Sequence, residues 1–131
     1  MKTIVALAFL LVAPLACSSA EPGSAASGKA AYVQKGIKPG KVVVGYLQDN
    51  ADPAQCSVVT DAPAKKDEFA RNADKLAQMV KGKVVASCPT DNVVGTCSAG
   101  FGMLVNYSGP KWTKESAKKD CVGHPHATWV E

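Results

Sequence analysis

The chain has 131 residues, of which 20% are charged, and a formal net charge of +4 at pH 7. This length allows one small domain. The basic residues alternate with carboxylates instead of gathering with aromatic residues, so the composition argues against a nucleic-acid-binding protein.

The N-terminus has the pattern of an export signal. Lys2 precedes an apolar run over residues 4–16, which is too short to cross a bilayer as a helix. Two cleavage sites compete. A cut before Cys17 fits a bacterial lipobox, although Pro14 stands where leucine is usual, and predicts a signal peptide over residues 1–16 with an acylated cysteine. A cut after Ala20 would give a signal over residues 1–20 and remove that cysteine.

We prefer lipidation of Cys17, because removing it from disulfide chemistry leaves an even number of cysteines for an oxidising compartment. The four that remain are Cys56, Cys88, Cys97 and Cys121. Residues 17–31 are rich in serine, alanine and glycine, which is typical of a flexible linker. Residues 32–131 are then predicted to form a single small domain. One interpretation of this domain is a degenerate duplication of a smaller unit.

After the linker, the β-branched and aromatic segment 41–47 predicts a strand, and residues 56–60 predict another. Residues 61–81 predict a long helix, with Pro63 in its first turn and Gly82 as the residue that ends it. An apolar stripe on this helix is predicted to be core and not a binding groove. It contains Phe69, Ala73, Leu76 and Val80.

The second half of the domain predicts a hairpin turn at residues 99–102 and a short helix over residues 114–121, capped by Thr113. Further strands are predicted at residues 83–88, 93–98, 103–107 and 127–130. Together these elements predict an α+β fold: a small, mostly antiparallel sheet of about five strands with one long and one short helix, stapled by disulfides.

The two halves of the domain share a local pattern. Residues 55–57 (Gln-Cys-Ser) and residues 96–98 (Thr-Cys-Ser) are each followed by a helix, a glycine and a strand. A degenerate duplication and a chance similarity both account for this pattern. It favours disulfides Cys56–Cys88 and Cys97–Cys121, each closing one half, and a staple between Cys88 and Cys97 is the main rival.

Several segments of the second half together resemble a group of small exported lipoproteins of myxobacteria and related bacteria. The matching segments are Cys88-Pro89, Val94-Gly95-Thr96-Cys97, Asn106-Tyr107-Ser108, Ala117, Cys121 and Thr128-Trp129. The resemblance covers about residues 86–130. In this chain Pro125-His126-Ala127 replaces the usual double glycine before the tryptophan. The resemblance implies a lipoprotein class and no particular activity.

Residues with chemical potential are few. His124 and His126 could hold zinc or copper, but a closed site needs more ligands, and a solvated loop is the preferred interpretation. Four aspartates are predicted to bond local backbone in turns instead of doing acid–base work. They are Asp49, Asp52, Asp61 and Asp91. We therefore predict no catalytic residue, no metal ligand and no cofactor.

The sequence thus predicts a lipoprotein of the bacterial cell envelope, anchored through Cys17 in the outer membrane, that acts as a non-enzymatic accessory or binding module. Its expected partners are the membrane, through the N-terminal lipid, and an unknown envelope protein; no small-molecule substrate is identified. A secreted, disulfide-stabilised inhibitor or ligand-binding protein, periplasmic or extracellular, is the alternative. A small metal-binding or hydrolytic enzyme using His124 and His126 is the third hypothesis.

Overall fold

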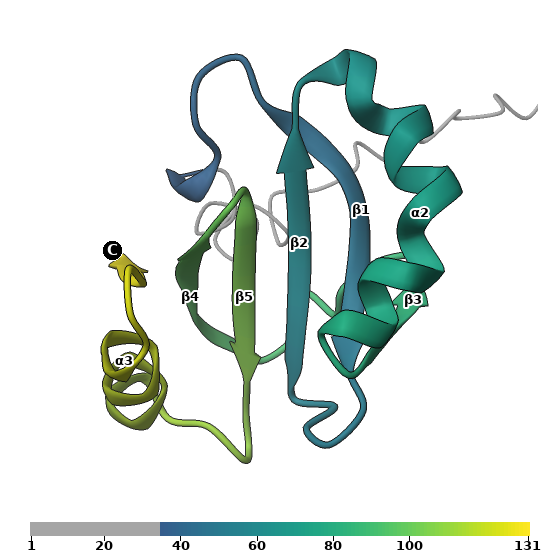
Figure 1. Cartoon of the computed structure of the whole chain (residues 1–131). Helices are drawn as coiled ribbons and strands as arrows, with labels where there is room; N and C mark the ends of the chain where they lie inside the picture. The colour runs from purple at the N-terminus through teal and green to yellow at the C-terminus, as the bar shows by residue number, and fades with distance from the viewer. Residues whose placement is uncertain (1–34) are drawn as a thin grey trace, which may run out of the picture.

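Six strands form one antiparallel sheet in residues 35–131, which are the residues that the computed structural model describes (Figure 1). They are β1 (Val42–Asp49), β2 (Gln55–Asp61), β3 (Gly82–Val85), β4 (Val93–Gly100), β5 (Met103–Ser108) and β6 (Thr128–Val130). Their order in the sheet is β3-β1-β2-β5-β4-β6. The predicted α+β class is confirmed, with six strands instead of about five. The predicted signal peptide, Cys17 and the linker to residue 31 lie outside the described residues.

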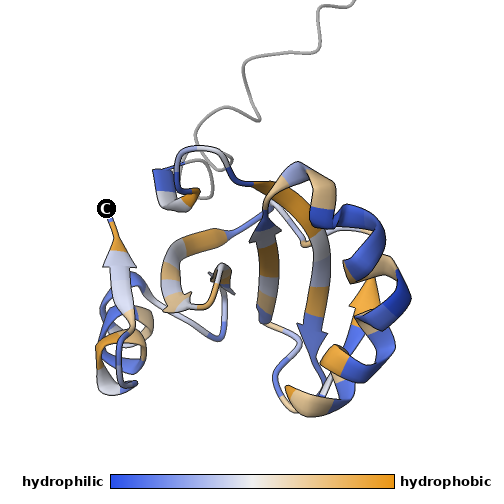
Figure 2. Ribbon diagram, turned by 45° about the horizontal axis from the view of Figure 1, so that its top comes forward, coloured by the Kyte–Doolittle hydropathy of each residue, from blue (hydrophilic) through white to orange (hydrophobic). Residues whose placement is uncertain are grey.

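Two helices lie on one face of the sheet (Figure 1). The first, α2 (Lys66–Met79), follows a short 3-10 helix, η1 (Pro63–Lys65), and the second is α3 (Lys114–Gly123). Helix α2 packs on β1 and β2, whereas α3 packs on β4, β5 and β6. In Figure 2, hydrophilic residues cover much of the outer side of α2 and hydrophobic residues recur along the strands.

The long helix is confirmed in kind but is shorter than residues 61–81. The predicted stripe does contact the sheet: Ala73 and its neighbour Ala77 are buried, while Phe69, Leu76 and Val80 are only half-buried. The prediction that Gly82 ends the helix is wrong, since Lys81 takes the left-handed conformation with φ 53° and Gly82 begins β3. Gly82 is needed there for space, because a Cβ atom would lie 2.6 Å from the Gln48 carbonyl oxygen.

The opposite face of the sheet has a buried cluster of its own, beside the helical residues 35–36. Cys56, Val58 and Leu104 form its buried centre together with Cys88, which lies beyond β3. Ile37 packs against the same cluster from the N-terminal side of β1. The Cys56–Cys88 disulfide, with a Cα–Cα distance of 5.6 Å, fixes the segment after β3 against this face.

The two halves of the domain repeat one topology. Each has two strands, a helix and a third strand, and the two second strands, β2 and β5, pair at the centre. The first strand of each half also has an irregularity before a glycine, between Val43 and Gly45 in β1 and between Val93 and Gly95 in β4. The sequence pattern that matches Cys56 with Cys97 does not follow this repeat, because Cys56 lies in a second strand and Cys97 in a first strand.

Candidate functional site

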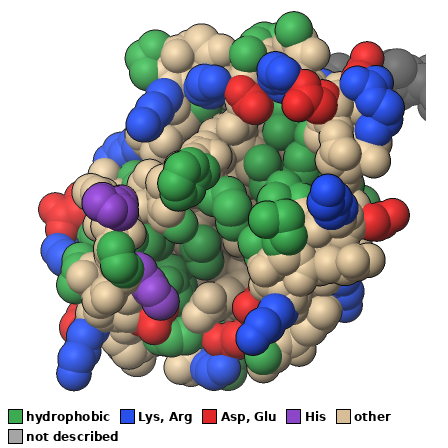
Figure 3. Space-filling view, viewed as in Figure 1, with side chains coloured by type: hydrophobic (Ala, Val, Ile, Leu, Met, Phe, Trp, Pro, Cys, Tyr) green, Lys and Arg blue, Asp and Glu red, His purple; other side chains and the backbone are tan. Residues whose placement is uncertain are grey.

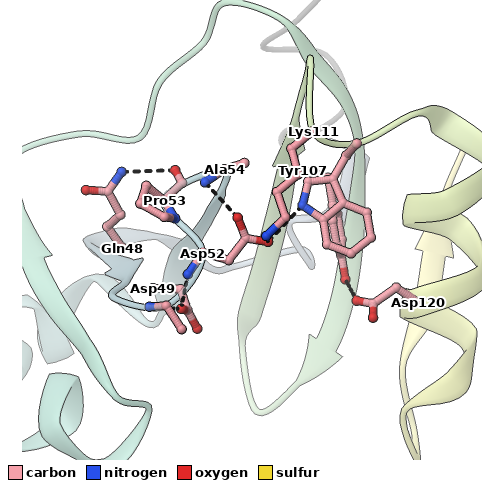
Figure 4. Close-up of polar contacts among 10 residues, drawn as sticks. Gln48, Asp49, Asp52, Pro53, Ala54, Tyr107, Lys111 and Asp120 are labelled. Atoms are coloured by element: carbon pink, nitrogen blue, oxygen red, sulfur yellow. Dashed lines mark hydrogen bonds and ion pairs between the residues drawn. The ribbon is translucent and has the colours of Figure 1, made fainter.

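A nearly buried carboxylate, Asp52, joins two loops at one end of the sheet (Figure 4). Its Oδ2 atom accepts hydrogen bonds from Trp112 Nε1 at 2.9 Å and from Lys111 Nζ at 2.8 Å, and its Oδ1 atom accepts one from the Ala54 amide at 3.1 Å. Burial acts to raise the pKa of Asp52, but the hydrogen bonds outweigh it and the pKa is lowered overall. Asp52 therefore stays ionised and ties the β1–β2 loop to the β5–α3 loop.

The same cluster extends to α3 through an aromatic pair. Trp112 packs edge-on against Tyr107, with ring centroids 4.9 Å apart, and the Tyr107 hydroxyl donates to Asp120 Oδ2 at 2.8 Å (Figure 4). Burial, and then the hydrogen bond to Asp120, raise the pKa of Tyr107 far above its usual value. Tyr107 is thus held as a hydrogen-bond donor. These contacts connect the β1–β2 loop, the β5–α3 loop, β5 and α3. Each polar group in the cluster already has a protein partner.

The histidines do not complete a catalytic or metal-binding arrangement with the described residues. His124 Nε2 lies 3.8 Å from Asp120 Oδ2, which is longer than a hydrogen bond, and the His124 side chain is 67% exposed. His126 is exposed and has φ 63°. No group of three or more histidine, cysteine or acidic side chains placed to hold a metal ion occurs within residues 35–131.

The four cysteines of the domain form two disulfides, Cys56–Cys88 and Cys97–Cys121. This pairing confirms the preferred prediction and excludes the rival staple between Cys88 and Cys97. The second disulfide joins β4 to α3, where both sulfurs are buried beside Trp129.

The turn aspartates also behave largely as predicted. Asp49 Oδ1 accepts from the amides of Ala51 and Asp52, each at 2.7 Å, and Asp61 Oδ1 accepts from the Ala62 amide at 2.7 Å. By accepting these hydrogen bonds, the carboxylates stabilise the backbone conformation of the turns. The sequence did not indicate that Asp52 would also accept a hydrogen bond from Trp112, because that contact joins residues sixty positions apart.

An apolar hollow of about 390 Å³ lies beside α2 on the helix-bearing face. Its apolar lining includes Val59 from β2, Phe69, Leu76 and Met79 from α2, and Phe101 from the β4–β5 turn. Figure 3 shows hydrophobic side chains gathered on this face, between the two helices and across β2 and β5. The stripe on α2 packs against the core as predicted, and two of its members, Phe69 and Leu76, also border the hollow next to the exposed Met79.

The rim of this hollow carries both signs of charge. Lys65 and Glu68 are paired with each other at its edge, and Lys75 lies about two turns further along α2. Met79 is 73% exposed and Phe101 is fully exposed, so the lining is open to solvent. An apolar floor with a mixed polar rim suits an interface with a protein segment.

Phe101 is the surface residue that sequence reasoning missed. The segment Gly100-Phe101-Gly102 was predicted as a hairpin turn, and the turn is confirmed, but the role of its phenylalanine was not considered. The available signal was the residue type: turns favour glycine, asparagine, aspartate and serine, and a phenylalanine at the tip is unusual.

No helix in residues 35–131 is both long enough and apolar enough to span a membrane. The chain matches no family model, no curated protein and no solved structure.

Proposed function

We propose that this protein is a lipoprotein of the bacterial cell envelope that acts as a non-enzymatic binding module, with the hollow beside α2 as its binding surface. The observation that carries the proposal is the hollow itself: two exposed apolar side chains, Met79 from α2 and Phe101 from the β4–β5 turn, border it among polar and charged residues, on a domain stapled by two disulfides. An apolar floor within a polar rim is the composition of a protein interface.

Export is supported by the two disulfides, which form and persist outside the reducing cytoplasm. The anchor is supported by the sequence around Cys17. The other four cysteines pair within the domain, so Cys17 has no disulfide partner there and is available for acylation.

The partner that we propose is a protein of the envelope that presents an apolar segment. A volume of about 390 Å³ accommodates a few apolar side chains but no extended domain face. The stapled scaffold favours binding because a surface that is already ordered loses little conformational entropy on association.

The anchor is tested by labelling the exported protein in bacterial cells with an alkyne fatty acid and measuring its intact mass without reduction. We expect acylation and two disulfides in the wild type, and no label in Cys17→Ser. An unlabelled wild-type protein that begins at Glu21 would contradict the anchor and favour the secreted alternative, since cleavage after Ala20 removes the cysteine.

The binding surface is tested by placing a photoreactive amino acid at Asn72 or Met79, which line the hollow, and at Asp74, an exposed position of α2 outside it. We expect the same crosslinked envelope protein from both hollow positions and none from Asp74. The crosslink should disappear when Leu76→Asp is added. Equal crosslinking from all three positions would contradict the proposed surface.

A further inference from the structure

The tip of the β4–β5 hairpin holds Phe101 in full exposure on a rigid turn. The Gly102 carbonyl oxygen accepts hydrogen bonds from the Thr60 amide at 2.7 Å and from the Thr60 hydroxyl at 2.8 Å. Gly102 has φ 78°, and a Cβ atom there would lie 2.3 Å from the Thr60 carbonyl oxygen. The turn is therefore fastened to the end of β2, and its phenyl ring projects from a fixed base.

The Phe101 side chain is unfavourable for folding in two ways. Its exposed fraction is 102%, so its ring gains nothing from burial, and its φ of 50° lies in the left-handed region that bulky residues avoid. Asparagine or glycine would relieve both problems at this position. Backbone strain of this kind, on an exposed apolar side chain, points to a contact with something outside the chain.

The chain enters the described structure at the same end of the molecule. Gly36, Lys38 and Lys41 line a small hollow of about 190 Å³ together with Phe101 and the rest of the tip. Any anchor at the N-terminal side of the domain is therefore attached next to Phe101. Seventeen residues separate Cys17 from Lys35 and can span at most roughly 60 Å.

Lys38 and Lys41 lie beside the tip, in the small hollow that Phe101 and the carboxylate Asp61 also line. Lys41 is paired with Asp61 and Lys65 with Glu68, while Lys35 and Lys38 make no ion pair with another described residue. Figure 3 shows basic and acidic side chains alternating along the upper margin of the molecule, above the β4–β5 turn in the view of Figure 1. A projecting aromatic ring among lysines is the combination that binds an anionic lipid surface: the ring enters the headgroup region and the lysines remain at the phosphates.

We infer that the hairpin tip, Gly100–Gly102, contacts an anionic phospholipid surface and orients the domain on the membrane. This inference rests on the proposed anchor at Cys17.

A lipid surface explains the tip better than a second copy of the chain does. A symmetric dimer formed through the tip would bring Lys38 of one copy close to Lys38 of the other, where their like charges repel each other. A bilayer accepts a projecting ring without a matching pocket, and its phosphates complement Lys35 and Lys38.

The test measures binding of the exported full chain carrying Cys17→Ser to sedimented vesicles. Vesicles of 30% phosphatidylglycerol in phosphatidylcholine are compared with vesicles of phosphatidylcholine alone. We expect binding to the anionic vesicles only. Phe101→Ser should lower the partition coefficient about tenfold, and Lys38→Gln about fivefold with a weaker salt dependence. The matched control is Val122→Ser, which removes a 59% exposed apolar side chain on α3, away from the tip, and should leave binding unchanged.

Equal binding by wild type and Phe101→Ser, or no binding to anionic vesicles, would overturn the lipid contact. A concentration-dependent mass in sedimentation equilibrium, abolished by Phe101→Ser in the absence of vesicle binding, would overturn it in favour of a dimer. Because this chain carries no lipid, its result is independent of acylation. Acylated wild type without tip binding rejects this inference alone, whereas tip binding without acylation rejects the anchor.

Discussion

The two halves of the domain have the same order of elements but hold their helices in different ways. Helix α3, with ten residues, is joined to β4 by Cys97–Cys121, capped by Thr113, and bonded to β5 through Asp120. Helix α2, with fourteen residues, has no covalent link to the sheet and is held by packing alone. The disulfide of the first half, Cys56–Cys88, lies on the face of the sheet opposite to α2.

The difference follows from helix length. Helices of ten residues form poorly unless tertiary contacts hold them, and only Ala117 and Cys121 of α3 are buried. Helix α2 has a longer apolar stripe that packs on the sheet, so packing suffices, and Met79 beside the stripe is left exposed at the hollow. A helix held by packing thus provides a binding surface that a short, stapled helix lacks.

The largest expected effect comes from removing either disulfide by a pair of Cys→Ala substitutions. The loops span 32 and 24 positions, so loop-closure entropy alone predicts a similar loss of about 3–4 kcal/mol for each. We expect the loss of Cys97–Cys121 to be the greater, because α3 depends on it. Urea unfolding measures the stability, and hydrogen exchange should show deprotection confined to α3. An equal loss of protection in α2 would contradict the comparison.

The next largest difference in stability between the halves is expected on substitution of Gly45 in β1 and Gly95 in β4. A Cβ atom at Gly95 would lie 2.2 Å from the indole of Trp129, and one at Gly45 would lie 1.9 Å from the ring of Phe69. Trp129 is buried, whereas Phe69 borders the open hollow and can move into it. We therefore expect Gly95→Ala to destabilise by about 3 kcal/mol and Gly45→Ala by about 1 kcal/mol.

Thermal or urea unfolding measures this difference between the glycines. Gly123→Ala is the control, since no atom lies within 4 Å of its added Cβ, and we expect no loss of stability. A greater loss for Gly45→Ala than for Gly95→Ala would show that α2 is packed as rigidly as the aromatic cluster of the second half.

Asp52 joins the two halves, and its charge makes their connection dependent on pH. Its pKa is lowered in the folded protein, so its stabilising effect is present above the pKa of the unfolded chain, near 4, and is lost as the pH falls through the folded value. We expect Asp52→Asn to lower stability by about 1–2 kcal/mol at pH 7. The difference from wild type should shrink below about pH 4. Asp74→Asn, at an exposed position of α2, serves as the control.

The smallest effects are expected at the surface ion pairs, one in each half. Lys41 pairs with Asp61 at the outer ends of β1 and β2, and Lys118 pairs with Glu131 beside β6. Each side chain is more than 40% exposed, so we expect Lys41→Gln and Lys118→Gln each to change stability by less than about 0.5 kcal/mol. A larger loss that vanishes in 1 M salt would contradict this expectation.

Local patterns predicted most of the elements. β-branched runs, the capping residue Thr113 and the glycine-rich hairpin are short-range signals, and the strands and helices lie close to where these signals place them. The end of α2 was predicted wrongly because two different reasons account for a glycine at position 82, a helix end and a close approach to another strand. The decisive one, its close approach to Gln48, lies across the sheet.

The candidate surfaces were less predictable. The stripe on α2 has one periodicity, but whether a given member is covered depends on which strands and turns lie opposite, and Leu76 and Met79 face an opening. Phe101 could be placed in a turn from sequence, yet its full exposure depends on how Thr60 fastens the hairpin.

The sequence by itself therefore determined the type of most elements, the export pattern and the cysteines available for pairing, because each depends on neighbouring residues or on composition. The tertiary structure decided the strand order, the repeat that pairs β2 with β5, the contact of Asp52 with Trp112 and the placing of Phe101 beside the entry of the chain. Those features join residues far apart in the sequence, and the free energy that selects them arises only when the sheet brings their side chains together.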